Sequence, residues 1–208
     1  MCGILFVHQK KNIILKSDFL SVLKSQKWRG PDNTSFKSFN DNKIFLGHNR
    51  LSIVDKKPRS NQPMESDDGR FFLIFNGEIY NYKEIIKKYK LKLRTTSDTE
   101  VVLKGYILKG KNIINDLDGM FSFVIYDKKN SSWICARDRF GIKPLFIYQD
   151  KIKTVIGSES GNIAKLLNLK IDHLSIKEWK LFRAPTPNFT FFKKLSQFPK
   201  SCYKTNTS

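Results

Sequence analysis

Strand-like patterns begin this sequence and return in its second half, and helix-like patterns lie between them and near the end. The predicted strands span residues 2–8, 34–39, 43–50, 71–75, 121–126, 133–137, 145–148 and 153–156, and the predicted helices span residues 16–28, 81–89, 97–110, 163–167 and 174–182. Strands and helices that do not alternate strictly argue against a doubly wound parallel sheet. The order favours an α+β fold in which helices cover two antiparallel sheets.

Turn and capping residues mark two of the boundaries. Asn76-Gly77 is a strong turn signal directly after the strand predicted for residues 71–75. Ser97 and Glu100 stand at the spacing of a capping box, in which the two side chains satisfy free N–H groups at the start of a helix. We therefore expect a turn at the first pair and a helix that begins at Ser97.

Composition limits the classes of partner. The 208 residues carry a formal net charge of +19, which could suit a nucleic acid or an anionic membrane. The lysines are scattered as single residues and short pairs, without the long runs of like charge that mark binding tails, so we interpret the excess as solvated surface and predict no nucleic-acid partner. No stretch approaches the roughly 18 apolar residues of a membrane span, so no membrane association is expected.

Cysteine and histidine positions argue against a metal site. The three cysteines are an odd number at wide spacing, which fits neither a disulfide framework nor a metal-binding pair, and a reducing cytoplasm is the expected location. The three histidines are equally scattered, and no Gly-rich phosphate loop is present. The sequence therefore predicts no metal and no ATP site in this chain.

Cys2 follows the initiator methionine directly. If Met1 is removed, Cys2 carries both a thiol and a free α-amine, whose usual pKa is roughly 7.7 to 8.0. Such an amine accepts a proton near neutral pH, so the residue can activate its own thiol as a nucleophile. The alternative from position alone is an ordinary buried cysteine at the start of a strand.

Seven motifs set this cysteine in a wider pattern. In chain order they are Met1-Cys2-Gly3-Ile4, Arg29-Gly30-Pro31-Asp32, Gly47-His48-Asn49-Arg50-Leu51-Ser52-Ile53-Val54-Asp55, Asn76-Gly77-Glu78-Ile79-Tyr80-Asn81, Ser97-Asp98-Thr99-Glu100-Val101, Leu117-Asp118-Gly119-Met120-Phe121 and Arg137-Asp138-Arg139-Phe140-Gly141-Ile142-Lys143-Pro144-Leu145. Together they closely resemble the glutaminase domain of class II glutamine amidotransferases, which are N-terminal nucleophile (Ntn) hydrolases, and most closely the asparagine synthetase B type.

This resemblance implies a fold and a domain organisation. The family fold is a four-layer αββα sandwich of two antiparallel sheets. Residues 2–187 would form the glutamine amidotransferase domain, and residues 188–208 a C-terminal extension where a synthetase domain would normally follow. ATP and Mg would belong to that absent domain, so no cofactor is expected here, and a synthetase domain or subunit is the expected partner.

The resemblance also implies roles for individual residues. Cys2 would attack the side-chain amide of L-glutamine, and the Asn76 side chain and the Gly77 backbone N–H would hold the oxyanion. Arg29 and Asp32 would support the pocket loop rather than react.

The remaining matched residues would bind the amino-acid end of glutamine. Arg50 would clamp the α-carboxylate, and Glu78 and Asp98 would receive the α-ammonium. Ile53 and Val54 would add backbone contacts, although both could instead belong to a core strand. An acidic residue such as Asp98 in the first turn also stabilises a helix without any ligand.

Three functions stay open from the sequence. The first is hydrolysis of glutamine to glutamate and ammonia for asparagine synthesis. The second is the same half-reaction for another acceptor, such as a cell-surface sugar. The third is a non-catalytic relic or interaction module, which six retained site residues argue against.

Overall fold

Two antiparallel sheets lie at the centre of the fold. The computed structural model describes residues 1–183, 186 and 188–206. The first sheet contains β1 (Gly3–Gln9), β2 (Asn33–Phe39), β3 (Ile44–Arg50), β8 (Phe146–Gln149), β9 (Lys153–Gly157) and β10 (Leu195–Gln197), in the order β10-β8-β9-β1-β3-β2. The second contains β4 (Met64–Glu65), β5 (Phe71–Ile79), β6 (Gly119–Asp127), β7 (Ser132–Arg137) and β11 (Tyr203–Thr205), in the order β11-β7-β6-β5-β4.

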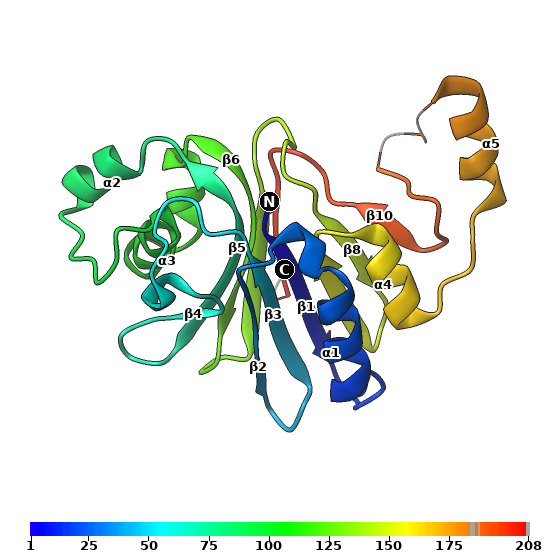
Figure 1. Cartoon of the computed structure of the whole chain (residues 1–208), viewed down its shortest axis with the longest axis horizontal. Coiled ribbons are helices and arrows are strands. Elements are labelled where there is room, and N and C mark those ends of the chain that lie inside the picture. Colours follow the sequence, from blue (N-terminus) through cyan, green and yellow to red (C-terminus); the bar gives the residue numbers. More distant parts are fainter. Residues whose placement is uncertain (184–185, 187, 207–208) are drawn as a thin grey trace.

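Helices cover the outer face of each sheet (Figure 1). On the first sheet lie α1 (Lys16–Ser25) and α4 (Ser160–Leu167), and on the second lie α2 (Tyr82–Tyr89) and α3 (Asp98–Lys109). Short 3₁₀ segments are η1 (Lys27–Arg29), η2 (Pro58–Ser60) and η3 (Gly110–Asp116), and α5 (His173–Phe182) projects away from the sandwich. These layers confirm the predicted αββα arrangement.

Strand β1 shows how one short sequence serves two layers. Successive side chains of a strand point to opposite faces of its sheet. Ile4 and Phe6 pack into the apolar layer between the two sheets, and Leu5 and Val7 pack against the outer helices. Because both faces are covered, the strand appears as a continuous apolar run without polar alternation.

The prediction of a turn at Asn76-Gly77 is wrong. Strand β5 runs through both residues to Ile79, and Asn76 and Gly77 pair with Ser122 and Phe121 of β6. A local turn signal is overridden here because the flanking residues continue an antiparallel ladder. The pair therefore belongs to a strand of the second sheet, held by β6 along one side.

Helix α3 begins where the capping residues predicted. The Ser97 hydroxyl accepts a hydrogen bond from the Thr99 N–H at 3.2 Å. The Glu100 carboxylate does not complete a capping box: it accepts hydrogen bonds from the N–H groups of Arg94 and Thr95. Glu100 thus fixes the preceding loop against the helix.

The C-terminal residues that the structure describes contribute one strand to each sheet. β10 pairs with β8, and β11 pairs with β7, so residues of the segment 188–208 add an edge strand to each sheet. The domain boundary expected at residue 187 lies outside the described residues.

His48 connects the two sheets through one hydrogen bond. It lies in β3, is fully buried, and its Nε2–H donates to the Phe75 carbonyl of β5 at 3.0 Å. Burial lowers the pKa of His48 to about 4. The imidazole is therefore neutral in the folded protein at pH 5 to 7.

This burial predicts acid sensitivity. Below pH 6.5 the unfolded chain binds a proton at His48 and the folded chain does not, so stability falls as the pH drops toward 4. At pH 4.5 this costs about 2 to 3 kcal/mol of unfolding free energy. Urea unfolding at pH 7 and 4.5 should show a smaller acid loss for His48→Gln than for the wild type. Equal losses of unfolding free energy in the two proteins would contradict a neutral, buried His48 imidazole.

Candidate active site

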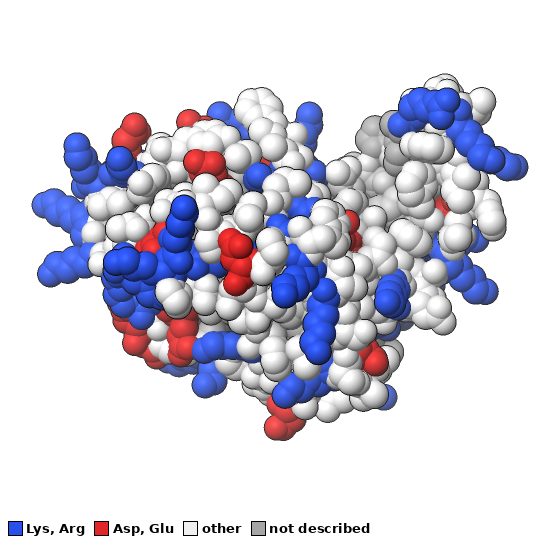
Figure 2. All heavy atoms as spheres, in the orientation of Figure 1, with Lys and Arg blue, Asp and Glu red and all other residues white. Residues whose placement is uncertain are grey.

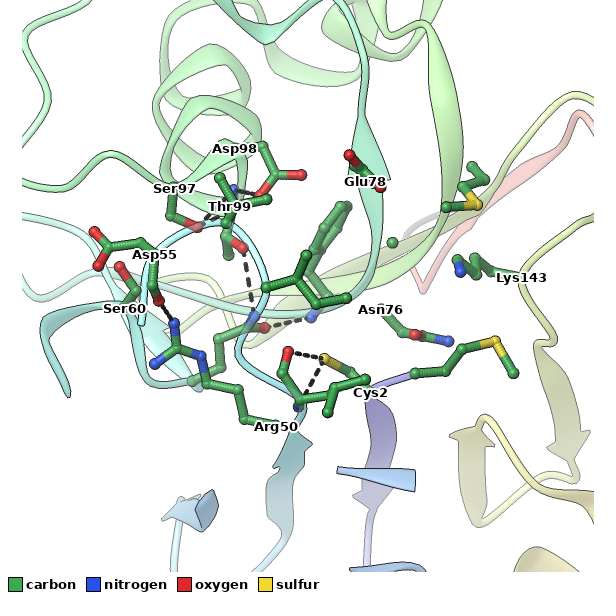
Figure 3. A pocket seen from close by; sticks show the side chains of 18 residues that line it. Cys2, Arg50, Asp55, Ser60, Asn76, Glu78, Ser97, Asp98, Thr99 and Lys143 are labelled. Carbon is green, nitrogen blue, oxygen red and sulfur yellow. Dashed lines mark hydrogen bonds between the residues drawn. The ribbon is translucent and has the colours of Figure 1, made fainter. Parts of the chain in front are cut away.

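Four chain segments converge on one cavity of about 280 Å³ (Figure 3). Cys2 precedes β1, Arg50 ends β3, Asn76 to Glu78 lie in β5, and Ser97 to Thr99 begin α3. The cavity is lined by Met1, Cys2, Arg50, Leu51, Ile53, Val54, Asp55, Ser60, Gln62, Phe75, Asn76, Gly77, Glu78, Ser97, Asp98, Thr99, Met120 and Lys143.

The Cys2 thiol is held at the base of this cavity. Its Sγ lies 3.4 Å from the Leu51 N–H nitrogen and 3.7 Å from the Leu51 carbonyl oxygen. Burial raises the pKa of the thiol, against the opposing effects of the Leu51 N–H and the Arg50 charge. At neutral pH the thiol is protonated, so a nucleophilic role requires a proton acceptor close to it.

Asn76 presents a free donor to the same space. Its side chain is only 1% exposed, and within the described residues its Nδ2 has no hydrogen-bond partner. A buried amide without a partner costs free energy, which a ligand atom at this position would recover. The group faces the cavity beside Cys2 (Figure 3).

Gly77 follows Asn76 at a point where two strands approach closely. A Cβ atom at Gly77 would lie 2.4 Å from the Met120 carbonyl oxygen and 2.7 Å from the Phe121 Cα. These are backbone atoms of β6, which cannot rotate away as a side chain can. Only glycine fits this position without moving the strand that carries Asn76.

Arg50 is braced by the loop that follows β3. Its guanidinium donates to the Lys57 carbonyl at 3.0 Å, to Asn61 Oδ1 at 2.8 Å and to the Asp55 carbonyl. The side chain is largely buried and its position is therefore fixed before any ligand binds.

Two carboxylates lie across the cavity from Cys2 (Figure 3). Asp98 accepts hydrogen bonds from the Ile79 and Thr99 N–H groups, both at 2.9 Å. Burial, together with the nearby charge of Glu78, raises the pKa of Asp98. An ammonium group placed between them would relieve that repulsion.

The structure brings together eight of the ten residues predicted for the site. Cys2, Arg50, Ile53, Val54, Asn76, Gly77, Glu78 and Asp98 all line the cavity. The alternative that Ile53 and Val54 are core strand residues is wrong, because both follow β3 in a loop and Ile53 is 65% exposed.

The other two predicted residues lie behind the cavity wall. Arg29 Nε donates to the Cys2 carbonyl at 2.9 Å, and its guanidinium also forms an ion pair with Glu159. Asp32 Oδ2 accepts from the Ser52 N–H at 2.7 Å. Both contacts fix the backbone next to a lining residue.

Several lining residues were not predicted from the sequence. Lys143 and Met120 lie within two of the seven motifs but received no role there. Asp55 orders the Arg50 loop: its carboxylate accepts from the Lys57 N–H at 2.9 Å and from the Thr96 hydroxyl at 3.0 Å. Position within a matched motif was the only available signal for all three.

Comparison with known families identifies the domain. The profile of the glutamine amidotransferase domain family matches residues 1–208. This chain belongs to that family. The match extends over the two C-terminal edge strands, β10 and β11.

The domain is similar to the first part of longer proteins. It is 35% identical to the putative asparagine synthetase [glutamine-hydrolyzing] 2 of Methanocaldococcus jannaschii, over 76% of this chain and 34% of that protein. It is 33% identical to asparagine synthetase [glutamine-hydrolyzing] 1 of Bacillus subtilis, over 90% of this chain and 31% of that protein. The chain spans about a third of the length of these relatives.

A solved structure shares the fold. The glutamine phosphoribosylpyrophosphate amidotransferase of B. subtilis, complexed with ADP and GMP, superposes with a TM-score of 0.67 at 20% identity, over 79% of this chain and 43% of that one. The likeness supports the αββα sandwich.

Charged side chains of both signs lie on the surface of the domain. Basic side chains are spread over the visible face of the amidotransferase domain, with acidic ones among them (Figure 2). Within the described residues no helix is long and apolar enough to cross a bilayer, and no three His, Cys, Asp or Glu side chains gather as metal ligands would.

The close approach at Gly77 is testable by substitution. Gly77→Ala should lower the unfolding free energy by about 1 to 3 kcal/mol, because the added methyl overlaps fixed backbone atoms. Gly161→Ala in α4 is the matched control: a Cβ there meets nothing within 4 Å, and alanine should stabilise the helix slightly. Thermal melting compares the stability of the two variants. Equal melting temperatures would refute the close backbone approach at Gly77.

Proposed function

We propose that this domain hydrolyses the side-chain amide of L-glutamine to glutamate and ammonia, with Cys2 as the nucleophile once Met1 is removed. The observation that carries the proposal is the Asn76 amide, which has no partner among the described residues, beside the Cys2 thiol in a cavity whose lining also includes Arg50, Glu78 and Asp98. That set of groups matches a substrate with a zwitterionic end and a neutral amide end.

The amino-acid end of glutamine is expected on the Arg50 side. The braced guanidinium of Arg50 suits the α-carboxylate, and Glu78 and Asp98 suit the α-ammonium. Ile53 and Val54 line the cavity from an exposed loop and offer backbone groups. This orientation points the side-chain amide toward Cys2.

The reaction then uses groups of this chain alone. The α-amine of the processed Cys2 takes the proton of its own thiol, and Sγ forms a bond to the amide carbon. Asn76 and the Gly77 N–H stabilise the oxyanion of the tetrahedral intermediate. The amine returns the proton to the departing nitrogen, the C–N bond breaks, ammonia leaves, and water hydrolyses the thioester.

The ammonia is expected to serve asparagine synthesis. The relatives named glutamine-hydrolyzing asparagine synthetases support this acceptor, and a synthetase domain or subunit with ATP and Mg would consume the ammonia. The second candidate, delivery to another acceptor such as a sugar, has no observation of its own in this chain. A cytoplasmic location is part of the same proposal.

A nucleophile test comes first. Purified protein should have an intact mass that lacks one methionine residue and should release glutamate from glutamine in a coupled assay. Cys2→Ala should abolish release, because no other described thiol lines the cavity. Cys202→Ser removes an exposed thiol outside the cavity and is the matched control. Release by Cys2→Ala would contradict the proposal.

A second test separates recognition of the ammonium from chemistry. Glu78→Gln removes a charge from a side chain that forms no hydrogen bond with the described residues, so KM for glutamine should rise about 10-fold with little change in kcat. Glutaramate, which is glutamine without its α-amine, should be hydrolysed equally by both proteins. A similar KM rise for glutaramate would exclude this role for Glu78.

A further inference from the structure

Lys143 enters the cavity from the loop between β7 and β8, and its backbone is fixed on both sides. The Lys143 N–H donates to Asp138 Oδ2 at 3.0 Å, and the Lys143 carbonyl accepts from Arg137 Nε at 2.8 Å. Asp138 is itself fully buried. The loop therefore holds this residue rigidly at the cavity wall.

The side chain of Lys143 is buried without a partner. The residue is only 7% exposed, and within residues 1–183, 186 and 188–206 its Nζ forms no hydrogen bond or ion pair. Burial lowers the pKa of the ammonium, while the nearby Cys2 and Glu78 oppose this effect. An ammonium in such a partly buried site is stabilised most when a negative charge faces it.

Lys143 lies away from the residues assigned to the amino-acid end of glutamine. Figure 3 shows Lys143 on the same side of Cys2 as Asn76, and Arg50 and Asp98 on the other side. The Asn76 amide, whose Nδ2 has no partner among the described residues, and the Lys143 ammonium thus lie at the end of the cavity assigned to the neutral amide. Glutamine places no charge at that end in its ground state.

At that end, glutamine develops negative charge only during the reaction. We propose that Lys143 is a further catalytic residue: its ammonium stabilises the anion that forms on the Cys2 sulfur and then on the oxygen of the tetrahedral intermediate. Lys143 keeps its protons throughout and forms no covalent bond. Interactions that strengthen only in the transition state raise kcat rather than affinity. The inference rests on the proposed hydrolysis of glutamine.

The test compares Lys143→Met, which removes the charge at similar length, with Lys143→Arg, which keeps it. Lys143→Met should lower kcat for glutamate release about 10- to 100-fold with KM nearly unchanged, since one unscreened charge is lost from a partly buried site. Lys143→Arg should recover most of this loss. Lys165→Met, on the exposed side of α4, is the matched control and should behave as the wild type.

A second readout does not depend on turnover. The rate of Cys2 alkylation by iodoacetamide, followed across pH by peptide mass spectrometry, should have its midpoint at higher pH in Lys143→Met than in the wild type. If the wild type fails to hydrolyse glutamine, the proposed function fails, but this shift still tests Lys143.

Three results would overturn the role of Lys143. The first is an unchanged kcat and an unchanged alkylation midpoint in Lys143→Met. The second is a raised KM at constant kcat, which would assign Lys143 to substrate binding. The third is an equal loss of kcat and melting temperature in Lys143→Met and Lys143→Arg, which would make the residue structural.

Discussion

The apolar layer between the two sheets is the interaction on which the rest of the structure depends. Ile4 and Phe6 of the first sheet pack there against Phe72 and Ile74 of the second. This packing places the start of β1 next to the middle of β5, and the buried His48–Phe75 hydrogen bond fixes their separation at the residue before Asn76. Cys2 and Asn76 thus reach the cavity from different sheets.

The sequence predicted the layers because its apolar patterns are local. Apolar runs, turn residues and the Ser97 cap located the five α-helices and eight of the eleven strands of the described residues, and they missed β4, β10 and β11. Asn76-Gly77 was misread as a turn because its conformation is decided by β6, about 45 residues away in the chain. Only the paired strand shows that Gly77 is needed for close approach rather than for a turn.

The site was predictable only where motifs carried it. Cys2, Arg50, Asn76, Glu78 and Asp98 are far apart in the sequence, and no periodic pattern connects them. Lys143 was missed because a lysine among 38 basic residues gives no signal, and its burial depends on the tertiary position of a loop. The braces around Arg50 are likewise invisible before the loop of residues 51–61 is folded.

The central place of β1 in its sheet bears on how the chain matures. This first strand pairs with β3 and with β9 (Lys153–Gly157), so one of its two neighbours is synthesised long after it. Until β9 has left the ribosome, the sheet around β1 stays incomplete. Cys2, which directly precedes β1, therefore reaches its final place in the cavity late in synthesis, whereas Met1 stays 54% exposed even in the folded domain.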